Sequence, residues 1–531
     1  MPRPVPVRGV IEGFYGPPWS HAARLDLVTF IAERAMNAYV YAPKSDPRHR
    51  DRWREAYEPA EAAQLSALAD ACADAGVRFG FAISPGLDVD YRDAGDRQTL
   101  VDKLGPLLDG GVDWVVLALD DIPNRAGLAV EQAELATWLS DQLPAVRLTL
   151  VPTEYVGTHP SPYLAELAAG MPATIDVMWT GPTVCSPVID AAAAHGWRTA
   201  IGNHPLLLWD NYPVNDTVME AELHLGPYTG RSATLTDELD GVLCNPMLQA
   251  QASKVALGTA AEFLRDPADY DPARAWARAI GEVGGTRAEA LAVLARACAD
   301  GPLVRSEHLV LHQLVADLER DAATPDWADA VADVRGELSA LRSARDAFEP
   351  DDALGDELRP WLEQAAREAD AGLAALRLVQ QVRPVATRDA SGAGRAVAPD
   401  PDAAMLHTFA LFFAWMGARQ GTPVVAGPRF ALHAAVVQLP GGQPALDIDL
   451  ALREDCSAID RLCRVALGEY RTWVGEADAG LEVRAGFEAL PLDPAGAFTA
   501  DTDTAALVLC GSRSTRVAAP STPPFRDARL S

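Results

Sequence analysis

The first half of the chain alternates short apolar runs with segments whose apolar residues recur at helical spacing. In one such segment Leu65 and Leu68 share a face, Pro59 opens the helix and Gly76 closes it. This alternation predicts a (β/α)8 barrel of the TIM type over residues 1–270. The alternative is a doubly wound open sheet, which would concentrate function at one switch point. The eight apolar runs of β type lie at residues 9–11, 38–41, 77–83, 114–119, 146–151, 175–178, 206–209 and 241–243.

Residues that can do chemistry follow nearly every apolar run. Barrel enzymes build their sites at the C-terminal ends of the strands, so we expect these side chains to meet at one mouth of the barrel. They are Glu12-Gly13, Lys44, Ser84, Asp120-Asp121, Glu154-Tyr155, Trp179-Thr180, Trp209-Asp210-Asn211 and Asn245.

The later part of the chain has a different pattern of hydrophobic and polar residues. Residues 271–387 have helical periodicity with few strand signals, which predicts a helical bundle. Residues 388–402 are rich in Gly, Ala, Pro and Asp and are expected to form a linker. The apolar stretch 405–416 is too short to span a bilayer and is expected to be a buried core helix. The sequence pattern of residues 403–531 predicts a smaller, mixed α/β region of unknown role. Its expected strands lie near residues 430–432, 445–450, 481–483 and 505–509.

Composition limits the partners of the protein. The 531 residues carry a formal net charge of −29, with a pI of about 4.7. This charge disfavours nucleic acid, anionic membranes and polyanionic glycans as partners. The N-terminal residues do not resemble a secretory signal, and the seven cysteines are scattered without metal-ligand or disulfide-framework spacing. We therefore expect a cytoplasmic protein, while the oligomeric state leaves no signal in the sequence.

Asp120 and Asp121 stand where the buried run 114–118 ends. Two adjacent aspartates are most often a solvated turn, because aspartate is mostly exposed. If both carboxylates enter one pocket, the strand must already be turning into a loop there, since a strand alternates its side chains between two faces. Two buried like charges raise the pKa of one of them, so one acid is protonated while its neighbour is ionised. A glycosidase needs that division of labour.

Seven motifs follow one another along residues 8–265. They are residues 9–16 (GVIEGFYG) with Pro18-Trp19-Ser20; 41–44 (YAPK) with Asp46, Trp53 and Arg54; 118–121 (ALDD); 152–155 (PTEY); 179–182 (WTGP); 209–216 (WDNYPVND); and 243–246 (LCNP). In this order they resemble glycoside hydrolase family 84, the β-N-acetylglucosaminidases that include the O-GlcNAcases. The helical segment that follows also looks like the bundle that this family appends to its barrel.

The resemblance implies a retaining exo-β-N-acetylglucosaminidase that hydrolyses terminal β-linked GlcNAc on a glycan or glycoprotein. In such enzymes the acetamido oxygen of the sugar attacks the anomeric carbon and forms an oxazoline. By resemblance, Asp120 orients and polarises the acetamido N–H. Asp121 protonates the leaving group and then acts as the base on water.

The resemblance also implies a set of sugar-binding residues. One position departs from the family, which often has Tyr where this chain has Thr217, and that departure puts contacts to the aglycone in doubt. The implied residues are Lys44 and Asn245, bonded to the sugar and acetamido group; Asp216, on the 4- and 6-hydroxyls; Asn211, a further polar contact; Trp209 and Tyr155, walling the acetamido pocket; Val151 and Thr180, its floor; and Gly13, whose carbonyl faces a sugar hydroxyl.

Two other functions remain possible at this point. One is a hyaluronidase-type glycosidase of the same fold, which the charge of −29 disfavours. The other is a barrel that binds GlcNAc without turnover, against which the intact aspartate pair speaks. No metal or cofactor is expected, because the implied mechanism requires none and the sequence has no credible phosphate loop or HExxH motif. The natural aglycone could be a protein Ser/Thr, a muropeptide or an oligosaccharide.

Overall fold

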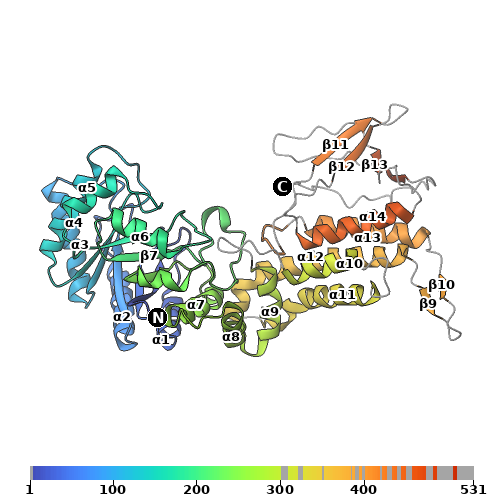
Figure 1. The fold of residues 1–531 in the computed structure, drawn as a ribbon, viewed down its shortest axis with the longest axis horizontal. Coiled ribbons are helices and arrows are strands. Elements are labelled where there is room, and N and C mark those ends of the chain that lie inside the picture. Colours follow the sequence, from blue (N-terminus) through green and yellow to red (C-terminus); the bar gives the residue numbers. More distant parts are fainter. Residues whose placement is uncertain are drawn as a thin grey trace. The chain divides into compact units, whose positions relative to one another are not determined.

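The chain divides into two compact units in the computed structural model, and Figure 1 traces it by colour. One unit holds residues 1–306 with 350–358, and the other holds residues 307–349 with 359–531. The residues that the structure describes are 4–299, 309–320, 327–349, 352–383, 386–388, 394–396, 401–418, 421–426, 433–438, 444–449, 457–473, 482–486 and 506–510.

The first unit is built on a closed barrel of eight parallel strands in sequential order, in which β8 pairs back with β1. This confirms the predicted (β/α)8 fold and excludes the open sheet. The strands are β1 (Val7–Glu12), β2 (Ala38–Tyr41), β3 (Arg78–Ile83), β4 (Trp114–Ala118), β5 (Arg147–Val151), β6 (Asp176–Trp179), β7 (Leu206–Asp210) and β8 (Gly241–Cys244). The helices are α1 (His21–Glu33), α2 (Pro59–Asp74), α3 (Ala94–Asp109), α4 (Leu128–Gln142), α5 (Pro162–Gly170), α6 (Ala191–Ala200) and α7 (Ala250–Arg265).

The crossover between β7 and β8 differs from the regular repeat. Residues 211–240, all of them described, form two short 3-10 turns, η1 (Thr217–Met219) and η2 (Ala233–Asp237), and no α-helix. Pro213 and Pro227 interrupt helical hydrogen bonding there. Gly230 brings its backbone so close to Pro187 that an added Cβ would lie 2.0 Å from the Pro187 carbonyl oxygen. The segment therefore packs as an irregular loop against the barrel.

Alternation along the strands separates two apolar layers. Ile11, Val116 and Trp209 belong to the cluster inside the barrel. Their strand neighbours Val10 and Val115 belong to the larger cluster of barrel and helix side chains. The interior is thus filled with side chains, and a pocket can form only where the strands end.

The helices after the barrel fall into both units. α8 (Pro272–Gly284) and α9 (Ala288–Ala297), together with η3 (Gly285–Arg287), belong to the barrel unit. α10 (Leu309–Arg320), α11 (Trp327–Ser343) with η5 (Ala344–Ala347), α13 (Pro401–Ala418) and α14 (Ala458–Trp473) belong to the second unit, whereas α12 (Ala353–Val382) begins in the first and continues into the second. A helical region thus follows the barrel, as predicted. The predicted boundaries at 270, 387 and 402 stay predictions.

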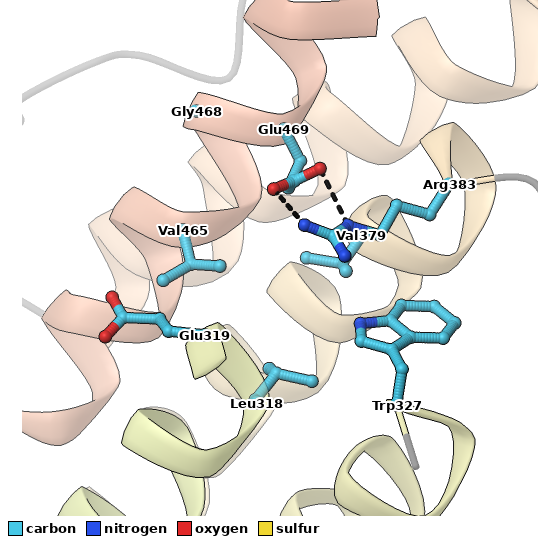
Figure 2. A pocket seen from close by; sticks show the side chains of 8 residues that line it. All are labelled: Leu318, Glu319, Trp327, Val379, Arg383, Val465, Gly468 and Glu469. Carbon is cyan, nitrogen blue, oxygen red and sulfur yellow. Dashed lines mark hydrogen bonds and ion pairs between the residues drawn. The ribbon is translucent and has the colours of Figure 1, made fainter. Parts of the chain in front are cut away.

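The second unit contains a cavity of about 240 Å³ between α10, α11, α12 and α14 (Figure 2). Its charged lining is already paired, because Arg383 forms a fork with Glu469 and lies over the Trp327 ring. Glu319, on the same lining, pairs with Arg461. These ion pairs leave no charge of the described lining directed at a ligand.

The rest of the second unit contains three two-stranded antiparallel ladders among the described residues. They are β9 (Ala386–Arg388) with β10 (Gly394–Ala396), β11 (His433–Gln438) with β12 (Pro444–Asp449), and β13 (Glu482–Gly486) with β14 (Ala506–Cys510). Three of the four expected strands coincide with β12, β13 and β14 to within a few residues, whereas the strand expected at 430–432 lies outside the described residues. Most of the expected linker 388–402 also lies outside them.

The apolar stretch 405–416 lies in α13, as a helix. Leu411 and Trp415 are buried, but Leu406 is 66% exposed and Phe413 is 45% exposed. The expected buried core helix is therefore buried on one face only. No helix in the described ranges is long and apolar enough to cross a membrane.

Candidate active site

Asp120 and Asp121 lie just past the end of β4. Asp121 has a φ of +57°, which takes the backbone out of the strand conformation at this residue. As a result, both carboxylates face the ammonium of Lys44, whose Nζ lies 2.5 Å from Asp120 Oδ2 and 3.7 Å from Asp121 Oδ2. The turn that the sequence required for a shared pocket is present, and the solvated Asp-Asp turn is excluded for Asp120, which is buried.

Lys44 follows β2 and is almost fully buried, with a side chain that is only 3% exposed. Its ammonium lies 5.6 Å from the centre of the Trp209 ring. A buried lysine requires a partner of opposite charge, and the two aspartates supply it. Lys44 is therefore not an ordinary surface lysine, because its charge is buried against the two aspartates.

Asp121 accepts two hydrogen bonds from tyrosines. Tyr15 Oη lies 2.7 Å from Asp121 Oδ2, and Tyr155 Oη lies 2.8 Å from Asp121 Oδ1. Burial raises the pKa of Asp121, but the charge of Lys44, the two tyrosine hydrogen bonds and the charge of Arg50 outweigh it and lower the pKa overall. The expectation that the paired charges raise the pKa of the acid is therefore wrong for Asp121, because Lys44 stands between the two carboxylates.

The two carboxylate oxygens of Asp120 differ in their hydrogen bonding. Oδ2 accepts from Lys44, whereas Oδ1 is buried and has no hydrogen-bond partner among the described residues. An unsatisfied buried acceptor is costly and rare in native proteins. It gives a ligand with an N–H or O–H donor a ready partner at this position.

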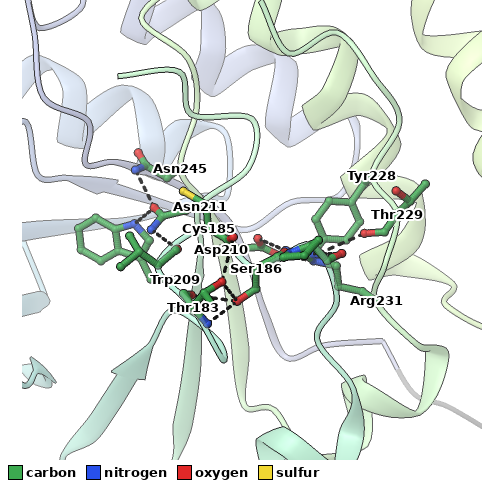
Figure 3. A network of polar contacts seen from close by, with 12 residues as sticks. Thr183, Cys185, Ser186, Trp209, Asp210, Asn211, Tyr228, Thr229, Arg231 and Asn245 are labelled. Carbon is green, nitrogen blue, oxygen red and sulfur yellow. Dashed lines mark hydrogen bonds and ion pairs between the residues drawn. The ribbon is translucent and has the colours of Figure 1, made fainter. Parts of the chain in front are cut away.

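One wall of the mouth is a chain of amide contacts, shown at the left of Figure 3. Asn211 Oδ1 accepts from Trp209 Nε1 and from Asn245 Nδ2, each over 3.0 Å. Asn245 Oδ1 in turn accepts from the backbone N–H of Gly13 over 3.1 Å. An added Cβ on Gly13 would lie 2.2 Å from Trp209 Cζ2, so only glycine fits there. Four of the predicted site residues thus form one contiguous wall.

Asp216 lies directly before η1 and is hydrogen-bonded to the GFYG motif. Its Oδ2 accepts from the backbone N–H of Tyr15 over 2.7 Å. Burial raises the pKa of Asp216, and its backbone hydrogen bonds oppose that rise only in part. The next residue, Thr217, has a φ of +53°, which is unfavourable for a β-branched side chain. A strained backbone at this point is a feature of the site that sequence patterns do not reveal.

The remaining predicted residues also lie at this mouth. Val151, the last residue of β5, belongs to the interior cluster with Trp209, and Tyr155 packs against that cluster. The backbone N–H of Thr180, just after β6, donates to the Tyr155 carbonyl over 3.0 Å. Tyr155 has a second task that the sequence did not predict, since its hydroxyl holds Asp121.

Several residues of the site escape sequence reasoning. Tyr15 contacts Asp121 through its hydroxyl and Asp216 through its backbone; its place inside the GFYG motif is the one signal that could have found it. Arg50 and Arg231 are buried, which sequence cannot predict for arginine. Conversely, Glu12 was a strand-end candidate but is fully buried and paired with Arg24 and Tyr39. Within the described ranges, no group of His, Cys, Asp and Glu could hold a metal ion.

A family model for beta-N-acetylglucosaminidase, NAGidase, matches residues 8–296, which is more than half of the chain. The chain belongs to this family. It is the glycoside hydrolase family 84 that the seven motifs predicted. The match runs from the second residue of β1 through the rest of the barrel and α8 to the last turn of α9.

Relatives of known name agree with this membership. The chain is 36% identical over 273 residues to "Protein O-GlcNAcase" of Rattus norvegicus and, equally, of Mus musculus, an overlap of 48% of this chain and 30% of theirs. It therefore spans less than a third of the length of these relatives. Among solved structures, a mutant O-GlcNAc hydrolase of Thermobaculum terrenum has a TM-score of 0.73 at 27% identity, covering 89% of this chain and 97% of that one. CpGH84B has a TM-score of 0.71 at 28% identity, covering 79% and 74%.

Proposed function

We propose that the protein is a retaining exo-β-N-acetylglucosaminidase of the O-GlcNAcase type, which removes terminal β-linked GlcNAc with the help of the substrate's own acetamido group. The observation that carries this proposal is the pair Asp120 and Asp121 around Lys44, with Asp120 Oδ1 buried and without a hydrogen-bond partner in the described part of the chain. The names of the relatives support the same activity.

The first half-reaction follows from the free acceptor on Asp120. Asp120 Oδ1 accepts the acetamido N–H, which fixes the acetamido oxygen beneath the anomeric carbon and makes that oxygen more electron-rich. The oxygen attacks the anomeric carbon and the glycosidic C–O bond breaks, which forms the oxazoline in its N-protonated form, with its N–H still bonded to the Asp120 carboxylate. The departing oxygen takes a proton from Asp121.

Asp121 must carry a proton at that moment, although the charge of Lys44 and the two tyrosine hydrogen bonds lower its pKa. Burial is already the largest single influence on Asp121 and raises its pKa. A bound sugar excludes more water from the carboxylate and strengthens this influence. In the second half-reaction the ionised Asp121 takes a proton from water, which attacks the anomeric carbon and opens the oxazoline with overall retention.

The other site residues serve recognition in this proposal. Lys44, Asn211 and Asn245 bond the sugar and its acetamido group, and the Asp216 carboxylate grips the 4- and 6-hydroxyls. Trp209 and Tyr155 wall the acetamido pocket; Val151 and Thr180 form its floor; the Gly13 carbonyl faces a hydroxyl. We further propose a GlcNAc-bearing glycoprotein or glycan as the substrate, a cytoplasmic location, no nucleic-acid or membrane partner, and catalysis without a metal. Domain bounds of 1–270, 271–387, 388–402 and 403–531 complete the proposal.

A series of aryl N-acetyl-, N-fluoroacetyl-, N-difluoroacetyl- and N-trifluoroacetyl-β-glucosaminides tests the function and the mechanism together. Each fluorine withdraws electrons from the attacking oxygen, so kcat should fall stepwise along the series. A flat series, or a sugar trapped on a side chain, would contradict substrate assistance. Absence of any turnover would instead leave a barrel that only binds GlcNAc.

A further inference from the structure

A buried ion pair lies directly behind the wall of the candidate acetamido pocket. Arg231 Nη2 lies 2.6 Å from Asp210 Oδ1 and Arg231 Nε lies 2.9 Å from Asp210 Oδ2. The two side chains are each only 1% exposed. Tyr228 Oη also donates to Asp210 Oδ2, over 2.6 Å. Asp210 ends β7 and is labelled near the centre of Figure 3, whereas Tyr228 and Arg231 come from the irregular crossover that follows and are labelled at its right.

Stability alone does not explain a pair in this position. Desolvating two charges offsets most of their mutual attraction, and well-packed apolar residues often stabilise such a site as well or better. What a bidentate Arg–Asp pair does supply is a fixed geometry for the backbone on both sides of it.

Arg231 fixes the loop after β6. Its Nη1 donates to the carbonyls of Ser186 and Pro187, over 2.9 and 3.2 Å. The same loop is held from the pocket side by Asn211, whose Nδ2 donates to the Val184 carbonyl over 2.8 Å. The loop 183–187 is therefore clamped between the ion pair and the amide wall of the pocket.

Asp210 fixes the wall itself. It sits between Trp209 and Asn211 in the chain, and its backbone carbonyl accepts from the backbone N–H of Asn245 over 2.7 Å. A shift of the Asp210 backbone would move both asparagines. It would also move the Trp209 ring, against which Gly13 is packed.

Loop 183–187 also carries Cys185, a half-buried thiol. Burial, followed by the nearby charges of Asp216 and Asp210, raises the pKa of Cys185 to about 11. Cys185 belongs to the clamped loop 183–187, which is bonded to the amide wall through Asn211 and to the ion pair through Arg231. Movement of this loop would therefore shift Asn211 and change the space available to the bound sugar.

We propose that Arg231 is a positioning residue that sets the width of the acetamido pocket, and with it the preference for N-acetyl over longer N-acyl groups. It acts through Asp210 and loop 183–187 without touching the substrate. This inference rests on the proposed glycosidase function.

Arg231→Lys tests the inference, because lysine keeps the charge but cannot grip Asp210 and the loop carbonyls at once. The assay is kcat and KM on an aryl N-acetyl-β-glucosaminide and on its N-propanoyl analogue. We expect kcat on the N-acetyl substrate to fall about 10–100-fold, because small displacements of an oriented group are costly. The N-propanoyl substrate should lose less, so the acetyl-to-propanoyl ratio of kcat/KM should fall at least about five-fold.

Arg147→Lys is the matched control. Arg147 and Asp176 form another largely buried arginine–aspartate pair, 2.5 Å apart, but they are the first residues of β5 and β6, at the opposite end of the barrel. This variant should lower stability and leave the selectivity ratio unchanged. If Arg231→Lys does not fold, Tyr228→Phe removes a single hydrogen bond to Asp210 and should shift the ratio in the same direction by a smaller factor.

The outcomes separate the inference from the function on which it rests. An unchanged ratio in a folded Arg231→Lys or Tyr228→Phe variant overturns the positioning role alone. An equal change in Arg147→Lys also overturns it, because the effect would then come from general destabilisation. Wild-type protein that turns over neither substrate overturns the proposed function, and this inference with it.

Discussion

The Tyr15→Phe substitution removes one hydrogen bond from the proposed general acid and keeps the aromatic ring. Tyr15 Oη donates to Asp121 Oδ2 over 2.7 Å, a contact that favours the ionised carboxylate. A hydrogen bond to a charged group contributes about 1.5–3 kcal/mol. The Asp121 side chain is 29% exposed, and water replaces part of that bond, so we take about half of this range. At about 1.4 kcal/mol per unit, the loss raises the pKa of Asp121 by roughly 0.5–1 unit.

The pH dependence of kcat/KM measures this shift. Its alkaline limb reports deprotonation of the acid in the free enzyme, and the apparent value belongs to the coupled aspartate pair. A raised pKa keeps Asp121 protonated to higher pH, so the alkaline limb should move up by roughly 0.5–1 unit. An aryl glycoside with a poor leaving group is the right substrate, because its cleavage depends on the proton.

Tyr57→Phe is the control for this experiment. Tyr57 Oη donates to Asp46 Oδ2 over 2.6 Å, so the variant loses the same kind of bond without touching Asp121. Its alkaline limb should stay in place. A Tyr15→Phe limb that stays still or moves to lower pH, in a protein that melts like the wild type, would refute the electrostatic account of Asp121.

Four further changes have definite expected outcomes. Asp121→Asn should lower kcat about 10²–10⁴-fold on poor leaving groups and far less on groups that leave without a proton, and equal losses on both would exclude the acid role. Gly13→Ala forces a Cβ to within 2.2 Å of Trp209 Cζ2 and should lower kcat/KM at least about ten-fold, whereas unchanged kinetics would show that the wall yields easily. Thr217→Asn suits a φ of +53° better and should stabilise the protein by up to about 1 kcal/mol in denaturant titrations; a loss of stability would show that the strain is not in the backbone. Glu357 accepts backbone N–H bonds at the start of α7, and burial raises its pKa from 4.5 to about 7, so the stability of the wild type falls as pH rises between these two values. The Glu357→Gln variant does not titrate there, so its stability relative to the wild type should increase by about 2–3 kcal/mol between pH 5 and pH 8. A stability difference that stays constant with pH would contradict the raised pKa.

Most of the barrel could be predicted because its determinants are local. Each strand is a short apolar run, and features such as the Ser20 cap of α1 and Pro59 at the start of α2 mark where helices begin. The missing helix between β7 and β8 is the exception. Apolar runs mark the strands but not the form of the connection between them, whereas the prolines and glycines of residues 211–240 disfavour a helix there.

The site could be predicted only as a set of residues, because its energetics depend on contacts between distant parts of the chain. Lys44 precedes Asp120 by 76 positions, yet their charges meet at 2.5 Å and reverse the expected pKa direction of Asp121. Arginine is exposed by default, so nothing in the sequence marks Arg231 as buried against Asp210. The ends of the predicted strands and the resemblance to the family indicate which residues are expected at the mouth, but not which of them neutralise one another.

The helix missing between β7 and β8 also determines how short a working fragment of this protein can be. Trp276 Nε1 on α8 donates to the Leu225 carbonyl, and Leu225 N–H donates to the Cys298 carbonyl beyond α9. Helices α8 and α9 and the residues just after them thus satisfy backbone groups that a regular helix between β7 and β8 would have satisfied within itself. A fragment that stopped at residue 270 would strip partners from the segment that carries Asp216 and Arg231. The smallest fragment worth expressing therefore extends to about residue 299, even though the strands of the barrel are complete at Cys244.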